Sequence, residues 1–341
     1  MYQLDRRGLL RSALAVGGAT LFAPLPRARA GSASELTLYN GQHRQTTDAV
    51  VAAFSEATGI EVLVRNGSSP QIANQILAEG ELSPADLFYS EGSPPVAALA
   101  GRGLLAPIAP ETLKQVPGLY VDQKGLWTGV SARCRVVAYN RDLIKESELP
   151  ASLLDFARPE WADRVAYAPT SDAFQEQIVT LLRMKGRDAT LAWLRGMKEV
   201  GRAFNNNIGA MQAVERGEIP TALINNYYWF TVAKEVGTER MRSALHYIGH
   251  QDPGALVTVS AAGILKTARN PEGAQRFLAF LVSEQGQTVI AKSMAEYPLR
   301  PGVTSPYALK PFDQLDPPPV TPAELGDAAE AIPLAREAGL A

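Results

Sequence analysis

The chain has 341 residues, of which 46% are hydrophobic and 20% are charged. This is ordinary globular composition, and the length predicts two lobes rather than one simple core. The 33 basic and 35 acidic residues give a net charge of −2, so the chain lacks the basic excess expected for binding nucleic acid or an anionic membrane surface. The single cysteine, Cys134, excludes an intramolecular disulfide, a Cys-rich zinc site and a cysteine-ligated iron–sulfur cluster.

Residues 1–30 have the layout of a cleavable export signal. A basic start is followed by a moderately apolar stretch of Ala, Leu and Gly, and the segment ends on the small-x-small pattern Ala-Arg-Ala at 28–30. This pattern predicts a signal peptide cleaved near Ala30, because the apolar stretch is too short and too rich in Gly to span a bilayer stably. The pair Arg6-Arg7 is compatible with twin-arginine export, and the general secretory route remains open.

The first part of the mature chain alternates between expected strands and helices. Strands are expected at 35–39, 60–65 and 86–89. The first helix is expected to be capped by Thr46-Thr47 and to end at Gly59, and further helices are expected at 71–79 and 96–100. This alternation predicts an α/β fold in which a mostly parallel sheet is covered by helices on both faces.

A second unit with the same kind of alternation follows. Its expected strands are 135–140, 165–168 and 221–225, and its expected helices lie near 173–184, 188–199 and 210–216. An extended segment at 256–265 would carry the chain back, so that two strands cross between the lobes as a hinge. We therefore expect a first lobe at 31–134 plus 261–302, a second lobe at 135–260, and a Pro-rich C-terminal wrap with a short terminal helix at 303–341.

Polar side chains gather where three of these strands end. The first strand leads to His43, the third to Glu91, and the strand at 221–225 to Tyr227 and Tyr228. In open α/β sheets a ligand binds beyond the carboxyl ends of the strands. Two phenolates and one carboxylate would balance the charge of Fe³⁺, and a neutral imidazole would add a fourth donor. These groups therefore predict a site for a hard trivalent cation.

An anion site is also predicted nearby. The segment 169–173 opens a helix, so its free backbone N–H groups and hydroxyls could hold an anion at the positive end of that helix. Asp172 opposes this interpretation because a carboxylate that caps the same helix N-terminus would repel a phosphate, and Ser171 could be a simple N-cap. The amides of Asn207 and Asn225 can donate without adding charge.

Several segments together resemble the periplasmic ferric-iron-binding proteins of bacterial ABC transporters, over essentially the whole mature chain. The resemblance implies a two-lobed, class II periplasmic binding protein fold with a hinged cleft. It implies that Fe³⁺ is bound by His43, Glu91, Tyr227 and Tyr228. It also implies a synergistic anion, phosphate or similar, or water, at Ser171, Ala173, Asn207 and Asn225. The segments that carry it are YNGQH (39–43), ADLFYSEG (85–92), PTSDAF (169–174), NNNIGAMQAVERGEIPTALINNYYWF (205–230) and EYPLRPGV (296–303).

The function implied by this resemblance is capture of Fe³⁺ in the periplasm and its delivery to an ABC permease in the inner membrane. The protein would act as a monomer, without nucleic acid, membrane insertion or enzymatic activity. Two alternatives remain open. The same fold could bind a small organic or oxyanion ligand, such as a polyamine, thiamine or a phosphonate, with the tyrosines stacking on it. A secreted metal-dependent hydrolase could use His43 and Glu91, although the sequence contains neither HExxH nor GxSxG.

A purely structural role is also open for several of these residues. Tyr227 and Tyr228 could be aromatic core residues. On a strand near a hinge, Arg133 and Arg135 are interpreted as members of structural ion pairs. His246 and His250 lack the spacing of a metal site, and Cys134 is interpreted as a small buried apolar residue.

Overall fold

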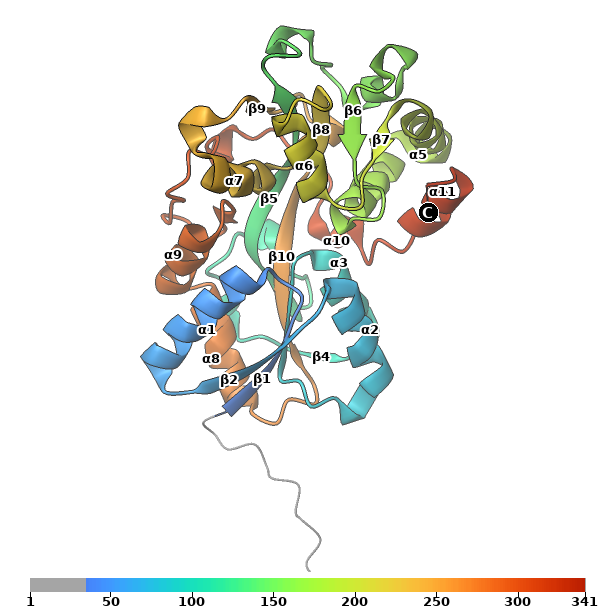
Figure 1. The fold of residues 1–341 in the computed structure, drawn as a ribbon. Helices are drawn as coiled ribbons and strands as arrows, with labels where there is room; N and C mark the ends of the chain where they lie inside the picture. Colours follow the sequence, from blue (N-terminus) through green and yellow to red (C-terminus); the bar gives the residue numbers. More distant parts are fainter. Residues whose placement is uncertain (1–34, 341) are drawn as a thin grey trace, which may run out of the picture. The chain divides into compact units, whose positions relative to one another are not determined.

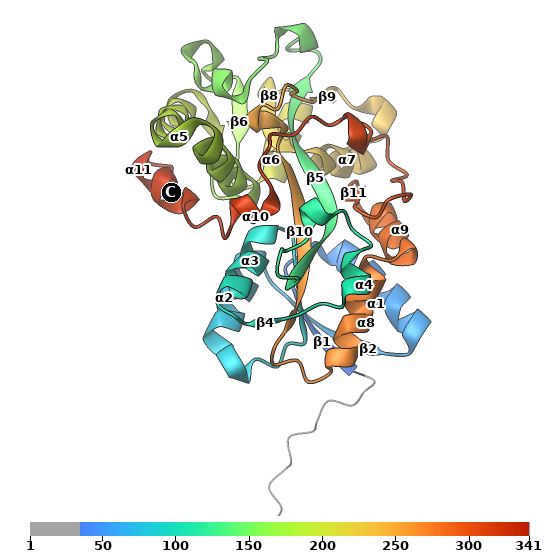
Figure 2. The same cartoon turned by 180° about the vertical axis from the view of Figure 1, so that it is seen from behind.

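The computed structural model describes residues 35–340 (Figures 1 and 2). The predicted signal peptide at 1–30, with its cleavage site and paired arginines, lies outside the described residues. Within the described range, no helix is both long and apolar enough to cross a membrane. The strands of this range are β1 (Glu35–Asn40), β2 (Glu61–Asn66), β3 (Leu87–Ser90), β4 (Leu105–Ala106), β5 (Trp127–Asn140), β6 (Val165–Tyr167), β7 (Arg202–Ala203), β8 (Thr221–Asn225), β9 (Ser243–His246), β10 (Val257–Leu265) and β11 (Tyr297–Pro298).

The α-helices lie between these strands and at the C-terminal end of the described range. They are α1 (Arg44–Thr58), α2 (Ser69–Glu79), α3 (Ser93–Gly101), α4 (Pro110–Leu113), α5 (Asp172–Val200), α6 (Asn207–Glu215), α7 (Asn226–Val236), α8 (Pro271–Leu281), α9 (Glu284–Ser293), α10 (Pro322–Leu325) and α11 (Ala331–Glu337).

One long strand, β5, joins the two halves of the sheet. The hydrogen-bonded order is β2-β1-β3-β10-β5-β8-β6-β7. In the first half β1 is parallel to β2 and β3, and in the second half β6 is parallel to β7 and β8. Residues 127–134 of β5 pair with β10, and residues 135–139 pair with β8, in both cases antiparallel. The sequence predicted only residues 135–140 as a strand here. Residues 130–136 do alternate between apolar and polar side chains, but the polar ones, Ser131, Arg133 and Arg135, are buried and do not face solvent.

In the first half, successive side chains of the sheet point to opposite faces, as the strand period requires. Leu36 and Leu38 of β1 pack with Phe54 of α1 and Phe277 of α8. On the other face, Phe88 of β3 belongs to the core cluster built with α2 and α3. Figures 1 and 2 show the same division, with α1 and α8 on one side of the strands and α2 and α3 on the other.

The second half repeats this plan with different helices. Val137 of β5 and Leu223 of β8 face the core cluster that contains α5, whereas their neighbours Val136 and Ile224 face the cluster that contains α6. Each half is therefore a mostly parallel sheet covered on both faces, and the predicted two-lobed α/β architecture is confirmed. The residue boundaries assigned to the lobes stay a prediction.

Two helix starts differ from the sequence prediction. Helix α1 begins at Arg44, with His43 as its N-cap, and not at the predicted Thr46-Thr47 cap. Thr47 lies inside the helix and donates its hydroxyl to Asn40 Oδ1 over 2.9 Å, so it is satisfied by a tertiary contact. Tyr227, predicted directly after the strand at 221–225, lies in the first turn of α7, a helix that the sequence analysis did not predict.

Helix α5 covers the range in which two helices were predicted. The two helical stretches are separated by a single residue, Gly186, whose φ of 80° and ψ of 173° are not helical. This region of backbone space is open almost only to glycine. Glycine therefore allows the chain to bend at this point while both stretches stay packed.

We predict that Gly186→Ala lowers the free energy of unfolding by about 1–3 kcal/mol. An added Cβ would meet no atom within 4 Å, so the loss comes from backbone conformation alone. Gly101 is the matched control, because its surroundings are equally open and its φ is not positive; Gly101→Ala should be neutral or slightly stabilising. Urea denaturation of both variants measures this, and equal midpoints for Gly186→Ala and wild type would contradict it.

Candidate metal centre

The position of His43 is set by the buried side chain of Asn40, at the end of β1. Asn40 Oδ1 accepts hydrogen bonds from the Gln42 N–H and the Thr47 hydroxyl, and its Nδ2 donates to the Gln42 carbonyl and to Asn66 Oδ1. These bonds fix the loop that leads into α1. His43 is the N-cap of α1, but its ring makes no capping bond, so the imidazole is free to face the centre.

Glu91 is held by a serine that the sequence analysis did not select. Ser69, at the start of α2, accepts a hydrogen bond from the Glu91 N–H at 3.0 Å and donates to the Gly41 carbonyl at 3.1 Å. A Cβ at position 41 would lie 2.5 Å from Ser69 Oγ, so only glycine allows this approach. Ser69 thereby connects the loops that carry His43 and Glu91. Because it is distant from both loops in the sequence, this connection forms only in the folded chain.

The two tyrosines are positioned by Asn226, the first residue of α7. Its Oδ1 accepts a hydrogen bond from the Cys134 N–H at 3.0 Å, and its Nδ2 donates to the Ala295 carbonyl at 2.8 Å. Consecutive residues of a helix point about 100° apart. The rings of Tyr227 and Tyr228 nevertheless stay in contact, with their centroids 4.2 Å apart.

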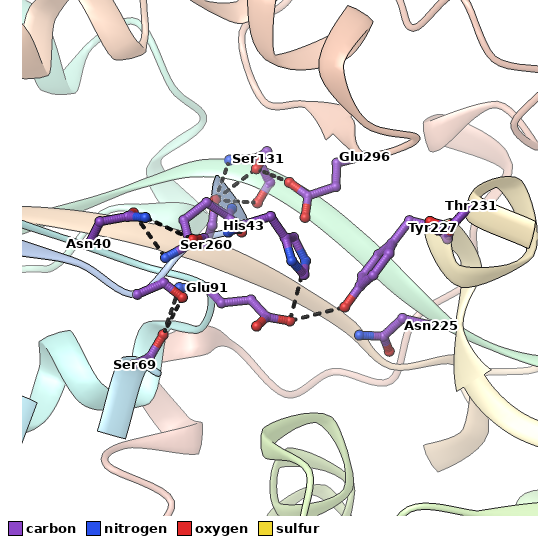
Figure 3. A network of polar contacts seen from close by, with 12 residues as sticks. Asn40, His43, Ser69, Glu91, Ser131, Asn225, Tyr227, Thr231, Ser260 and Glu296 are labelled. Atoms are coloured by element: carbon purple, nitrogen blue, oxygen red, sulfur yellow. Dashed lines mark hydrogen bonds and ion pairs between the residues drawn. The ribbon is translucent and has the colours of Figure 1, made fainter. Parts of the chain in front are cut away.

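Three of the four predicted metal ligands meet at a single carboxylate oxygen (Figure 3). The Tyr227 hydroxyl donates to Glu91 Oε1 over 3.0 Å, and His43 Nε2 lies 3.6 Å from the same oxygen. The His43 and Tyr227 rings pack edge to face at 5.1 Å. Because Glu91 and His43 follow strands of the first half of the sheet and Tyr227 follows β8, this contact joins the two halves.

Both phenols are held in their protonated form. Burial, followed by the negative charge of Glu91, raises the pKa of Tyr227 well above its ordinary value. The same two causes raise the pKa of Tyr228 to about 12. Among residues 35–340, no group of three or more His, Cys, Asp or Glu side chains could hold a metal ion. A metal at this centre would therefore need the phenol oxygens and would have to displace their protons.

The predicted anion-binding residues of α5 are partly engaged by the helix itself. Ser171 is the N-cap of α5: its hydroxyl accepts a hydrogen bond from the Phe174 N–H at 3.3 Å and donates to the Ala168 carbonyl at 2.9 Å. Ala173 is buried in the first turn. The N-cap interpretation of Ser171 thus describes its contacts in this structure.

The two predicted asparagines carry unused polar atoms. Asn207, at the start of α6, is buried and its Oδ1 has no hydrogen-bond partner, while its side chain helps to lower the pKa of Tyr228. Asn225 accepts a hydrogen bond from Arg135 at 3.2 Å, and its Nδ2 has no partner. Arg135 also donates to the Leu223 carbonyl, so these polar contacts take the place of the ion pair that the sequence suggested. The free Asn225 donor is suited to an anion.

Buried charges surround the centre. Arg133 of β5 is 2% exposed, and two of its guanidinium nitrogens, Nε and Nη1, have no hydrogen-bond partner. Burial lowers its pKa, but the charges of Glu296, Glu91 and Glu176 outweigh this effect, so the pKa of Arg133 is raised. Glu176 of α5 is 1% exposed, and burial raises its pKa to about 7, against the lowering effect of Arg133.

The sequence analysis missed both Glu176 and Glu296. For Glu176 a signal exists: it lies four residues after Asp172, so both carboxylates share one face of a helix that begins at the predicted anion site. Glu296 accepts a hydrogen bond from the Ser131 hydroxyl (Figure 3). That contact joins parts of the chain 165 residues apart, and no local pattern announces it.

The fold is that of a solute-binding protein. The chain belongs to the family of bacterial extracellular solute-binding proteins, whose model matches residues 83–319. It is 43% identical over 309 residues to the major ferric iron-binding protein of Neisseria meningitidis serogroup B, covering 90% of this chain and 93% of that one.

Two further comparisons agree with this one. The Fe(3+)-binding periplasmic protein of Serratia marcescens is 38% identical over 315 residues, covering 92% of this chain and 93% of that one. Among solved structures, iron-bound HitA from Pseudomonas aeruginosa is 50% identical with a TM-score of 0.87, covering 90% of this chain and 99% of that one. The resemblance predicted from the sequence is confirmed.

The raised pKa of Glu176 predicts how stability depends on pH. The folded chain holds this proton up to about pH 7, whereas the ordinary value is 4.5, so unfolding releases the proton between these values and stability falls as the pH rises. The loss is at most about 3 kcal/mol, and Glu176→Gln should remove it. Urea denaturation of the iron-free proteins at several pH values tests this; parallel profiles for wild type and variant would contradict it.

Proposed function

We propose that this protein captures Fe³⁺ between its two lobes in the periplasm and delivers it to an ABC permease of the inner membrane. The ion is the protein's substrate. Its proposed ligands are His43 and Glu91 from the first lobe and Tyr227 and Tyr228 from the second. The names of the relatives, which are those of ferric-iron-binding and periplasmic binding proteins, support this proposal.

The single observation that carries the proposal is the contact of Tyr227 and His43 with one oxygen of Glu91. It gathers an imidazole, a carboxylate and a phenol from loops far apart in the chain, with a second phenol packed alongside. Two phenolates and a carboxylate supply three negative charges, which match Fe³⁺ better than Zn²⁺, Ca²⁺ or Mg²⁺. An ion bound there would hold the lobes together, because its ligands come from both.

The remaining ligands of an octahedral ion are proposed to come from a small oxyanion such as phosphate, or from water. The unpartnered Nδ2 of Asn225 and the nearby Asn207 support an anion on the second-lobe side. Ser171 and Ala173 would present the N-terminus of α5 to it. The hydroxyl of Ser171 would then have to be shared between the anion and its present capping contacts.

The proposal also covers the export, the oligomeric state and the non-enzymatic role of the protein. The protein would be exported by a signal peptide cleaved near Ala30, act as a monomer and catalyse no reaction. The alternative of an organic ligand caged by aromatic rings is less well supported, because the Tyr227 hydroxyl points at Glu91 (Figure 3). A cage would instead present ring faces to the ligand.

Ferric loading should give the protein a visible absorption band, because charge transfer from phenolate to Fe³⁺ is coloured. Tyr227→Phe and Tyr228→Phe should each weaken the band and lower the affinity by roughly a thousandfold, the scale of losing one charged partner from a buried set. The double variant should be colourless. Titration with ferric iron, followed by absorption spectroscopy, measures both effects.

Tyr39→Phe is the matched control for these variants. Tyr39 is a buried phenol whose hydroxyl also donates to a glutamate, Glu79, at 3.0 Å, but it lies away from the centre. Its variant should keep the full band. A wild-type protein that stays colourless with iron, or a band that survives in the double variant, would overturn the ferric proposal.

Iron binding should also release protons. Because Tyr227 and Tyr228 have raised pKa values, both phenols are protonated at pH 7, and ligation should release about two protons per ion. Apparent affinity should therefore rise about 100-fold for each pH unit between roughly pH 6 and 8. Calorimetry in buffers of different ionisation enthalpy, corrected for the iron donor, counts these protons. Tyr228→Phe should release about one fewer, and a count near zero in wild type would exclude phenol ligation.

A further inference from the structure

A separate cavity of about 220 Å³ lies beside the candidate metal centre. Its walls come from α2, α3, the start of α5 and the segment between α10 and α11. The C-terminal helices contact both halves of the molecule here, since α10 packs on α3 and on α5 (Figure 2). None of the four proposed metal ligands lines this cavity, so it is distinct from the metal centre.

The carboxylate of Glu176 forms part of the cavity wall. This side chain is 1% exposed, and neither of its oxygens has a hydrogen-bond partner. A Cβ built on Gly92, another wall residue, would lie 3.1 Å from Glu176 Oε1. The absence of a side chain at position 92 therefore leaves room on the cavity side of that oxygen, which is itself almost fully buried. Arg133 offsets part of the charge of Glu176 but makes no hydrogen bond to it. Buried oxygens without a hydrogen-bond donor cost free energy, which a donor in the cavity would recover.

Two other polar residues of the cavity wall are acidic, as Glu176 is. Asp172, four residues before Glu176 on α5, and Asp327, across the cavity, are both wall residues. Burial and the charge of Glu91 raise the pKa of Asp172 to about 6, against the lowering effect of the buried Arg133. No Lys or Arg of the described chain lines the cavity. An anionic ligand is therefore disfavoured.

The rest of the lining is apolar. The apolar wall residues include Leu77, Pro94, Pro95 and Ile332. A bare metal ion does not suit this surface, and within residues 35–340 no group of three His, Cys, Asp or Glu side chains could bind one. The volume equals that of about seven water molecules in the liquid at roughly 30 Å³ each, so a compact organic molecule fits.

We propose that this cavity binds a small organic cation, with its ammonium group against Glu176 and its hydrocarbon part against α2 and α3. An ammonium group supplies the hydrogen-bond donors that the Glu176 oxygens lack and the positive charge that the three acidic side chains favour. The apolar wall would remove the hydrocarbon part from water. This site does not depend on the proposed iron function.

The test is a calorimetric titration of the iron-free mature protein with three compounds of nearly equal shape: cyclohexylammonium, cyclohexanol and cyclohexanecarboxylate. We expect the cation to bind with a dissociation constant of about 1 mM or tighter, at least about tenfold tighter than the alcohol. The carboxylate should not bind. Equal affinities for cation and alcohol, or no binding of the cation, would overturn the proposal. Iron is absent throughout, so the result is independent of the ferric proposal.

Three variants locate the site. Glu176→Gln keeps the shape and removes the charge, so it should weaken binding of the cation at least about tenfold and leave the alcohol unchanged. Ala98→Leu should fill the cavity and block both ligands. Glu79→Gln, a charge-removing change outside the cavity, should have no effect. Circular dichroism and urea midpoints check that each variant is folded, and a folded Glu176→Gln that binds the cation as wild type does would refute the proposal.

Discussion

The hydrogen bond from Tyr227 to Glu91 is the contact around which the candidate centre is built, because it joins groups carried by the two halves of the sheet. A buried phenol beside a carboxylate stays protonated and donates a hydrogen bond to it. The same pair that would bind a metal therefore holds the metal-free arrangement together. Its geometry depends on Asn40, Ser69 and Asn226, three buried polar side chains whose hydrogen bonds fix the loops. Each of them connects backbone groups that no secondary-structure ladder pairs, which is the usual reason for burying an amide or a hydroxyl.

Strand β5 carries this arrangement between the lobes. Its first part pairs with β10 and its last part with β8, and Arg133 lies near the change of partner. Burying a guanidinium with unpartnered nitrogens is unfavourable unless opposite charges surround it. Glu91, Glu176 and Glu296 provide those charges, from three different elements. The charge of Arg133, on the strand that joins the halves, is thereby balanced by these glutamates. Movement of one half relative to the other would therefore change the electrostatics of the centre.

Much of the fold could be predicted from the sequence, and the failures have physical reasons. The alternation of short apolar strands with amphipathic helices was enough to predict both α/β units, and the positions of His43 and Glu91 after β1 and β3 followed from the rule that strand ends form sites. The first part of β5 was missed although its side chains alternate between apolar and polar, because its polar face is buried among charged partners and does not meet solvent as in an ordinary half-exposed strand. Ser69 and Glu296 escaped because their partners are distant in the chain. Glu176 escaped because a carboxylate within the first turns of a helix ordinarily favours the helix dipole and needs no further role.

The acidic surroundings of the centre also restrict the anion that could complete the proposed iron site. Asp172 and Glu176 have pKa values of about 6 and about 7 in this structure, so near neutral pH at least part of their charge would face an anion bound at the start of α5. A doubly charged anion would meet repulsion from these carboxylates, which the neutral amides of Asn207 and Asn225 and the buried charge of Arg133 offset only in part. Protonation of either carboxyl reduces the repulsion and turns an acceptor into a donor. For the proposed iron site we therefore expect a singly charged oxyanion or water to be preferred over a dianion, and this preference should weaken as the pH falls below about 6 because both carboxyls are then mostly neutral.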